Sequence, residues 1–237
     1  MFSLGIRNLD KRGTKKIPKI IHQTYKNHDL PELYRKCQIE IKRLHPDFEY
    51  RFYTDQDMDM IMKKEFPEYY DKFNELSRMI MKIDMFRYFL MYKYGGLYVD
   101  MDYYMFKPFD LLEHDVVIPC NKEDRYGNFL CLGNCIFASR PGHIFWKNLM
   151  DTLFTIDRSR EEYNYDKNID ENGLGTGPMF VYTRWGEYSK QKQDIYIPRK
   201  YLFHPLTKKD DDHMEKLRKA GHYGMHICTG LWRDEKL

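Results

Sequence analysis

The stretch that most constrains the fold runs from Gly95 to Asp102 (GGLYVDMD). Its two glycines end the preceding helix, because glycine adopts the left-handed conformation of a helix C-terminus at little cost. A short apolar strand follows, and Asp100 and Asp102 come directly after it. Carboxylates at the end of a buried strand are costly unless a positive charge lies beside them. A hard divalent cation, Mn²⁺ or Mg²⁺, with a diphosphate as its second ligand, is the natural candidate.

Strands and helices alternate through the first half of the chain, which is typical of an α/β protein with a mostly parallel sheet flanked by helices. No Gly/Ser linker or internal repeat divides the chain, so we expect a single domain at 17–237 after a basic tail at 1–16. The expected strands cover residues 17–25, 49–53, 97–99, 116–119, 130–139 and 195–198. The expected helices cover residues 31–44, 56–65, 76–94, 141–156 and 207–220, with a break at Pro67.

Composition narrows the class of protein. The net charge of +3 is too small to argue for nucleic acid. No apolar run approaches the roughly 18 residues that span a bilayer, and the N-terminus lacks the apolar region of a signal peptide. Five scattered cysteines without a C-x-x-C motif favour free thiols in a reducing compartment. We therefore expect a cytoplasmic protein with a solvated tail, and contact of that tail with an anionic membrane surface is the alternative.

Further candidate residues lie where open α/β sheets bind ligands, beyond the carboxyl ends of the strands. The first expected strand, 17–25, runs into a polar loop, in which we place residues 22–25 (HQTY). On the helix before the two aspartates, Asp84 and Arg87 are spaced i, i+3 and share a face. A buried pair of this kind either clamps the helix to the sheet or binds a phosphate and a sugar hydroxyl.

The C-terminal segment adds two candidates. A neutral imidazole at His226 can complete the coordination of a carboxylate-bound cation, although an isolated histidine is more often structural. Gly224 argues against a helical i, i+4 zinc pair of His222 with His226. Trp232 serves either as a core anchor or as a lid over a diphosphate.

Several segments match a known family in order and spacing. They are IPKIIHQTYK at 17–26, KIDMFRYFLMYKYGGLYVDMD at 82–102, NCIFASRPGHIFW at 134–146, GTGP at 175–178 and H-x5-W at 226–232. Together they resemble the D-x-D-containing, sugar-binding-region glycosyltransferases (glycosyltransferase family 32 type), the group that includes the Och1-like mannosyltransferases. The central piece is the most specific, because it holds an Asp-x-x-Arg helix, a Gly-Gly stop and a D-x-D in one 21-residue frame.

The resemblance implies a GT-A-type, Rossmann-like fold and a metal-dependent transfer of a hexose that retains the anomeric configuration. The donor would be a nucleoside-diphosphate sugar, and we favour a UDP-sugar over GDP-mannose. The acceptor would be a glycan, a glycolipid or a protein. Because the chain offers no convincing nucleophile for the opposite face of the sugar, we prefer a front-face substitution.

The resemblance also implies roles for particular positions. Asp102 would bind Mn²⁺ or Mg²⁺ directly, and Asp100 would bind the ribose, the donor sugar or the metal with its water. Asp84 and Arg87 would hold the donor sugar and diphosphate, so these four residues form the expected catalytic set. The remaining expected contacts are His22, Gln23, Thr24 and Tyr25 to the nucleotide, Asn134 and Gly177 to the sugar or acceptor, His226 to the metal, and Trp232 to the diphosphate.

The chain departs from the family pattern in two ways. Members commonly carry a Gly-Ser-Trp after the histidine, whereas this chain has Gly230-Leu231-Trp232. Many eukaryotic members also carry an N-terminal membrane anchor, and its lack here predicts a bacterial, viral or otherwise cytosolic setting. A non-catalytic sugar-nucleotide-binding protein is the main alternative function. An aspartyl-phosphate phosphatase fits less well, because Tyr104 stands where those enzymes place Thr or Val.

Overall fold

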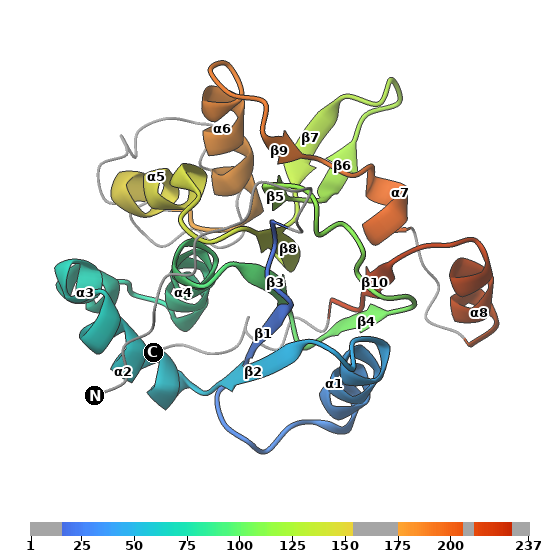
Figure 1. Cartoon of the computed structure of the whole chain (residues 1–237), viewed down its shortest axis with the longest axis horizontal. Helices are drawn as coiled ribbons and strands as arrows, with labels where there is room; N and C mark the ends of the chain where they lie inside the picture. The colour runs from blue at the N-terminus through green and yellow to red at the C-terminus, as the bar shows by residue number, and fades with distance from the viewer. Residues whose placement is uncertain (1–15, 154–174, 206–210, 229–237) are drawn as a thin grey trace.

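One mixed sheet organises the protein (Figure 1). The computed structural model describes residues 16–153, 175–205 and 211–228. Within these ranges the main sheet has six strands, in the order β2-β1-β3-β8-β5-β9. They are β1 (Ile20–Thr24), β2 (Glu49–Tyr53), β3 (Gly96–Val99), β5 (Val116–Val117), β8 (Ile136–Ser139) and β9 (Ile195–Tyr196). Five of the six run parallel, and β8 runs against its neighbours β3 and β5.

Helices cover both faces of this sheet, as Figure 1 shows. They are α1 (Glu32–Leu44), α2 (Asp55–Glu65), α3 (Pro67–Asn74), α4 (Met79–Lys93), α5 (Ile144–Leu153), α6 (Pro178–Tyr188), α7 (Lys200–Phe203) and α8 (Asp211–Lys219). No described helix is long and apolar enough to cross a membrane. The mostly parallel sheet with flanking helices confirms the predicted α/β fold class. The domain limits at 1–16 and 17–237 stay a prediction, because both ends of the chain lie outside the described residues.

Two short antiparallel pairs complete the described fold. Strand β6 (Cys120–Glu123) pairs with β7 (Phe129–Leu132) as a hairpin. Strand β4 (Tyr103–Met105) pairs with β10 (Gly224–His226), so that His226 lies opposite Tyr103. This second pairing brings the C-terminal strand against the residues that directly follow the two aspartates.

The central strand β3 separates the two halves of the core. Leu97 and Val99 pack into the cluster on the α1 side of the sheet, and Tyr98 packs into the cluster around α4 and α5. This is the alternation that a strand imposes on its side chains. All four residues of β3 are buried. The two aspartates are therefore attached to one of the most completely enclosed strands of the sheet.

The expected break at Pro67 is confirmed, because α2 ends at Glu65. Pro67 then occupies the first turn of α3, a helix that the sequence did not predict and where a proline needs no hydrogen-bond acceptor for its nitrogen. One expectation about the strands was wrong. The expected single strand at 130–139 is two strands in different sheets. Residues 133–135 leave the ladder between them, and Gly133 donates its amide to the Pro119 carbonyl instead. The break carries Asn134 into the site described below.

Candidate functional site

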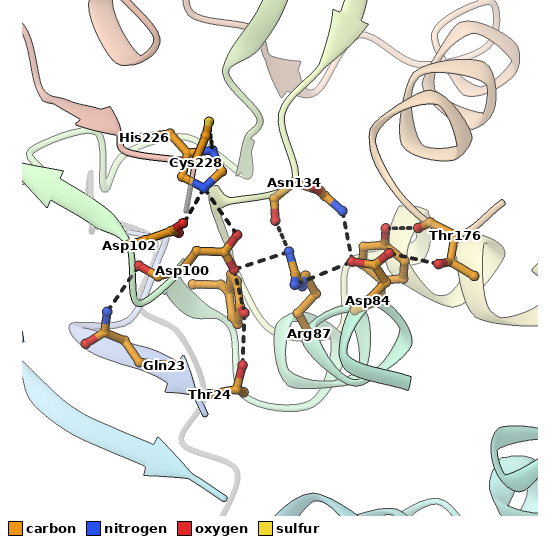
Figure 2. A network of polar contacts seen from close by, with 12 residues as sticks. Gln23, Thr24, Asp84, Arg87, Asp100, Asp102, Asn134, Thr176, His226 and Cys228 are labelled. Atoms are coloured by element: carbon orange, nitrogen blue, oxygen red, sulfur yellow. Dashed lines mark hydrogen bonds and ion pairs between the residues drawn. The ribbon is translucent and has the colours of Figure 1, made fainter. Parts of the chain in front are cut away.

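Asp100 is held at the end of β3 by contacts from three directions (Figure 2). Its amide donates to the Cys135 carbonyl at 2.7 Å, which fixes the main chain. Its Oδ1 accepts a hydrogen bond from the Tyr98 hydroxyl at 2.9 Å and lies 3.4 Å from Nη1 of Arg87. Gln23 reaches the Asp100 carbonyl from β1 at 3.4 Å. These contacts leave Oδ2 of Asp100 directed to the other side, towards His226.

The second aspartate meets the histidine from the distant strand β10. Nε2 of His226 lies 2.9 Å from Oδ1 of Asp102 and 4.0 Å from Oδ2 of Asp100. One ligand atom from each of these three residues falls within 4.8 Å of the others. Two carboxylate oxygens and an imidazole nitrogen form a donor set that suits Mn²⁺ or Mg²⁺. The residues present therefore fit the cation that the sequence predicts.

The charge state of this group supports the same interpretation. Burial raises the pKa of Asp100 above its ordinary value, with a further contribution from the nearby Asp102 that Arg87 and His226 oppose. Burial would lower the pKa of His226, but Cys135 and the hydrogen bond to Asp102 raise it well above its ordinary value. The two carboxylates thus lie in a place that favours a positive charge, which a proton on His226 or a divalent cation can supply.

A second polar network lies on α4, on the far side of Arg87 (Figure 2). The fully buried Asp84 accepts hydrogen bonds from Nδ2 of Asn134 at 3.0 Å and from the Thr176 hydroxyl at 2.8 Å. Nη2 of Arg87 lies 3.4 Å from Oδ1 of Asp84. Nη1 of Arg87 donates to the Asn134 carbonyl. Arg87 therefore connects the Asp84 network to Asp100.

Arg87 stays charged in this setting. Burial works against its charge, but the carboxylates of Asp100 and Asp84 more than offset that and raise the pKa of the guanidinium. The guanidinium also lies over the ring of Tyr98, 4.7 Å from its centroid. Its Nε is buried and has no hydrogen-bond partner among the described residues. A fixed guanidinium next to a cation site is a suitable anchor for a diphosphate.

The loop expected at 22–25 after the first strand was wrong, because His22, Gln23 and Thr24 lie within β1 itself. The four residues divide into two pairs. Gln23 contacts the Asp100 carbonyl directly, and Thr24 shares a 3.1 Å hydrogen bond with the Tyr98 hydroxyl, which in turn contacts Asp100. His22 instead lies 2.9 Å from the Tyr53 hydroxyl and 2.8 Å from the Gly95 carbonyl. Tyr25 packs edge-on against Tyr34.

His22 is an internal support in this structure. It is completely buried, and burial lowers its pKa to about 3. Both of its ring nitrogens contact groups of the protein, so the expected contact with a nucleotide has no free nitrogen to make it. By holding the Gly95 carbonyl, His22 fixes the helix end from which β3 starts.

The remaining expected residues have different surroundings. Asn134 contacts Asp84 through its side-chain amide and Arg87 through its carbonyl. Gly177 is the N-cap residue of α6, where its carbonyl accepts from the Val181 amide. Trp232 lies outside the described residues.

Three contributors to the site were not singled out from the sequence. Tyr98 contacts Asp100, Thr176 contacts Asp84, and Cys228 contacts His226. Thr176 stands inside the GTGP segment, whose position next to a predicted helix was a usable signal. Tyr98 and Cys228 gave no signal, because a strand tyrosine and a scattered cysteine are ordinary features of a sequence.

Comparison with known families and curated proteins agrees with this geometry. Residues 31–119 match the family described as "Glycosyltransferase sugar-binding region containing DXD motif". The chain is 30% identical over 230 residues to mannosyl phosphorylinositol ceramide synthase SUR1 of Saccharomyces cerevisiae, covering 91% of this chain and 58% of the relative. It is 31% identical over 176 residues to inositol phosphoceramide mannosyltransferase 3 of Schizosaccharomyces pombe, covering 73% and 46%. The chain thus spans about half the length of the curated relatives it matches.

A solved glycosyltransferase, PaToxG, resembles the chain more distantly. It has a TM-score of 0.49 and 15% identity, with 74% of this chain and 71% of that chain covered. The main sheet is the mostly parallel, helix-flanked sheet that was predicted for a GT-A-type fold. The two curated relatives come from yeasts, so they do not support the expected bacterial or viral setting.

Proposed function

We propose that this chain is a glycosyltransferase of the group with a D-x-D-containing sugar-binding region, and that it transfers a hexose from a nucleoside-diphosphate sugar. The observation that carries the proposal is the convergence of Asp100, Asp102 and His226 within 4.8 Å of one another. Asp100 and Asp102 lie near the middle of the chain and His226 lies 124 residues after Asp102, and the three meet next to the buried guanidinium of Arg87. A cation site beside a fixed positive charge fits a diphosphate leaving group.

Each residue has a separate task in this proposal. Asp102 and His226 would hold the Mn²⁺ or Mg²⁺ together with Asp100. When bound, the cation would neutralise the diphosphate as the bond to the sugar breaks. Arg87 takes part of the same negative charge, and its contacts with Asp84 and Asp100 keep it in place without reorganisation. Gln23 supports Asp100 directly from β1 and Thr24 supports it through Tyr98.

The surroundings of Asp84 bear on the stereochemistry. Asn134, Thr176 and Arg87 all contact its two carboxylate oxygens. A carboxylate engaged in this way is a weak nucleophile, and it is better suited to orient Arg87 or accept a sugar hydroxyl. This favours the front-face substitution with retention over a covalent intermediate on Asp84. Asn134 and Gly177 would line the sugar or acceptor side of the same pocket.

The relatives bear on the donor and the acceptor. The sequence led us to favour a UDP-sugar, but the relatives named above transfer mannose according to their names. We therefore place GDP-mannose first among the donors. Both names also contain an inositol phosphoceramide. An inositol-bearing glycolipid accordingly comes first among the acceptors that we considered, before glycans and proteins.

A turnover assay tests the proposal. The purified chain is incubated with GDP-mannose, or with UDP-sugars, with Mn²⁺ or with EDTA. Release of the nucleoside diphosphate and transfer to inositol phosphoceramide in detergent are measured. We expect metal-dependent turnover that is at least 100-fold lower in Asp102→Ala. Metal-dependent binding without any turnover would instead support the alternative, a non-catalytic sugar-nucleotide-binding protein.

A further inference from the structure

Cys228 lies beside the cation site in an uncommon conformation. It follows β10 by two residues, and its Sγ is 3.2 Å from Nδ1 of His226 (Figure 2). Its φ of 55° makes it the one non-glycine residue of the described chain with a positive φ. Such a conformation is uncommon for a residue with a Cβ and is strained. The amide of its neighbour Ile227 donates a hydrogen bond to the Asp102 carbonyl at 2.9 Å, which fixes the turn next to the site.

The two nitrogens of His226 have different partners. Nε2 lies towards Asp102 and Asp100, and Nδ1 lies towards Cys228; the buried thiol of Cys135 also lies beside the ring. An imidazole binds a metal through one nitrogen, and an outer partner of the other nitrogen fixes the tautomer and the orientation of the ring. That outer partner is usually a carboxylate, a carbonyl or water. Here the group at this position is a thiol, which acts as a weak hydrogen-bond partner.

We propose that Cys228 is a positioning residue for the cation: its thiol holds Nδ1 of His226, so that Nε2 faces Asp102 and the metal. This inference rests on the proposed function, because it assigns a role towards the same cation. It goes beyond that function by naming a residue that binds neither the metal nor the donor. All five cysteines of the chain are described, and Cys228 is the exposed one. A thiol-specific reagent can therefore reach it selectively.

The test measures Mn²⁺ binding in the full chain from the electron paramagnetic resonance signal of free Mn²⁺, with and without GDP. The variants are Cys228→Ala and Cys228→Ser, and the matched control is Cys120→Ala. Cys120 is a buried cysteine whose thiol donates hydrogen bonds to the carbonyls of Lys122 and Cys131 in the β6–β7 hairpin. We expect Cys228→Ala to weaken Mn²⁺ binding about 10-fold or more, as loss of an outer partner typically does. Cys228→Ser should stay within about 3-fold of the unmodified chain, because a hydroxyl makes the same hydrogen bond. Cys120→Ala should bind like the unmodified chain.

A second measurement does not depend on a substitution. N-ethylmaleimide should add one adduct to the native chain, seen in the intact mass, and none to Cys228→Ala. The labelled chain should lose Mn²⁺ affinity at least as much as Cys228→Ala. Circular dichroism of each protein in EDTA should show an unchanged fold, because the side chain is exposed.

The outcomes separate this inference from the proposed function. If the unmodified chain binds Mn²⁺ and Cys228→Ala binds it equally well, the positioning role is overturned and the proposed function stands. Equal losses in the alanine and serine variants would overturn the hydrogen bond as the cause. If the unmodified chain binds no Mn²⁺ with or without GDP, both the cation site and the role of Cys228 are overturned.

Discussion

Arg87 lies between two carboxylates that belong to different elements. It is 3.4 Å from Asp84 on its own helix and 3.4 Å from Asp100 after β3. The charge of Arg87 offsets part of the cost of burying the two carboxylates. Arg87 therefore has the structural role, an ion pair that clamps the helix to the sheet, which was one of the two alternatives that the sequence left open. Its place beside the aspartates also suits a diphosphate. The two roles make different demands, since a clamp needs a charge and a diphosphate site needs the planar fork of donors.

Substitution of Arg87 can therefore distinguish the two roles. Arg87→Gln should lower the free energy of unfolding by about 3 kcal/mol, because it leaves the buried Asp84 without its cation. Arg87→Lys keeps a charge and should cost less stability, but it should lose at least 100-fold in metal-dependent turnover. Urea unfolding and the turnover assay measure the two effects. A lysine variant with full activity would limit Arg87 to the structural role.

The elements that deliver the aspartates are fixed by two glycines with positive φ. Gly95 and Gly96 have φ of 63° and 94°. A Cβ on Gly96 would come within 2.6 Å of the Ile20 carbonyl oxygen, and one on Gly95 would come as close to the Ser139 carbonyl oxygen. The glycines thus end α4 and also let β3 lie tightly between β1 and β8. Both properties place the D-x-D at a fixed point of the sheet.

A pair of glycine-to-alanine substitutions tests this tight placement. Gly142 also has a positive φ, of 68°, but no atom lies within 4 Å of the place where its Cβ would stand. Gly142→Ala should cost only the conformational strain, about 1 kcal/mol. Gly96→Ala adds a backbone clash and should cost at least 2 kcal/mol more in urea unfolding. Equal losses would show that the region around β3 relaxes easily.

Sequence patterns predicted the elements better than the contacts between them. The helix, the Gly-Gly stop and the strand before Asp100 follow from local propensity, and the i, i+3 spacing placed Asp84 beside Arg87. The break at 133–135 had a local signal, because Gly133 and Asn134 are turn-forming residues, but the pairing of β8 with β3 in a different sheet from β7 depends on long-range contacts. The approach of His226 to Asp102 likewise depends on the pairing of β10 with β4.

At the scale of the whole molecule, buried histidines make stability depend on pH. Burial lowers the pKa of His22 to about 3, and it does the same for His204. Both are neutral in the folded protein, while an unfolded histidine has a pKa of about 6.5. The difference in pKa between the unfolded and the folded protein contributes to the free energy of unfolding. This contribution is fully present above pH 6.5 and is lost as the pH falls from 6.5 towards 3.

Unfolding experiments at several pH values should show this loss. Between pH 6 and pH 4 each of the two histidines should lower the free energy of unfolding by up to about 1.4 kcal/mol per pH unit. His204→Leu should reduce the dependence of the unfolding free energy on pH, because it removes one of the two titrating histidines. Nε2 of His204 has no hydrogen-bond partner among the described residues, so the substitution breaks no hydrogen bond of this nitrogen. An unchanged slope in this variant would show that other groups cause the acid sensitivity.

The whole molecule brings together a site whose parts lie far apart in the chain. Gln23, Arg87, Asp100, Asn134 and His226 come from five different segments, and the sheet and the β4–β10 pair hold them together. The central claim is that this assembly holds a divalent cation and a nucleoside diphosphate at the same time.

Isothermal titration calorimetry of GDP, with Mn²⁺ and with EDTA, tests that claim most directly. The unmodified chain should bind GDP at least 10-fold more tightly with Mn²⁺. Asp102→Asn should lose this dependence on Mn²⁺, whereas Asp212→Asn, at an exposed position of α8, should keep it. GDP or UDP binding that is equally tight with Mn²⁺ and with EDTA, or an Asp102→Asn variant that keeps the dependence on Mn²⁺, would contradict the claim.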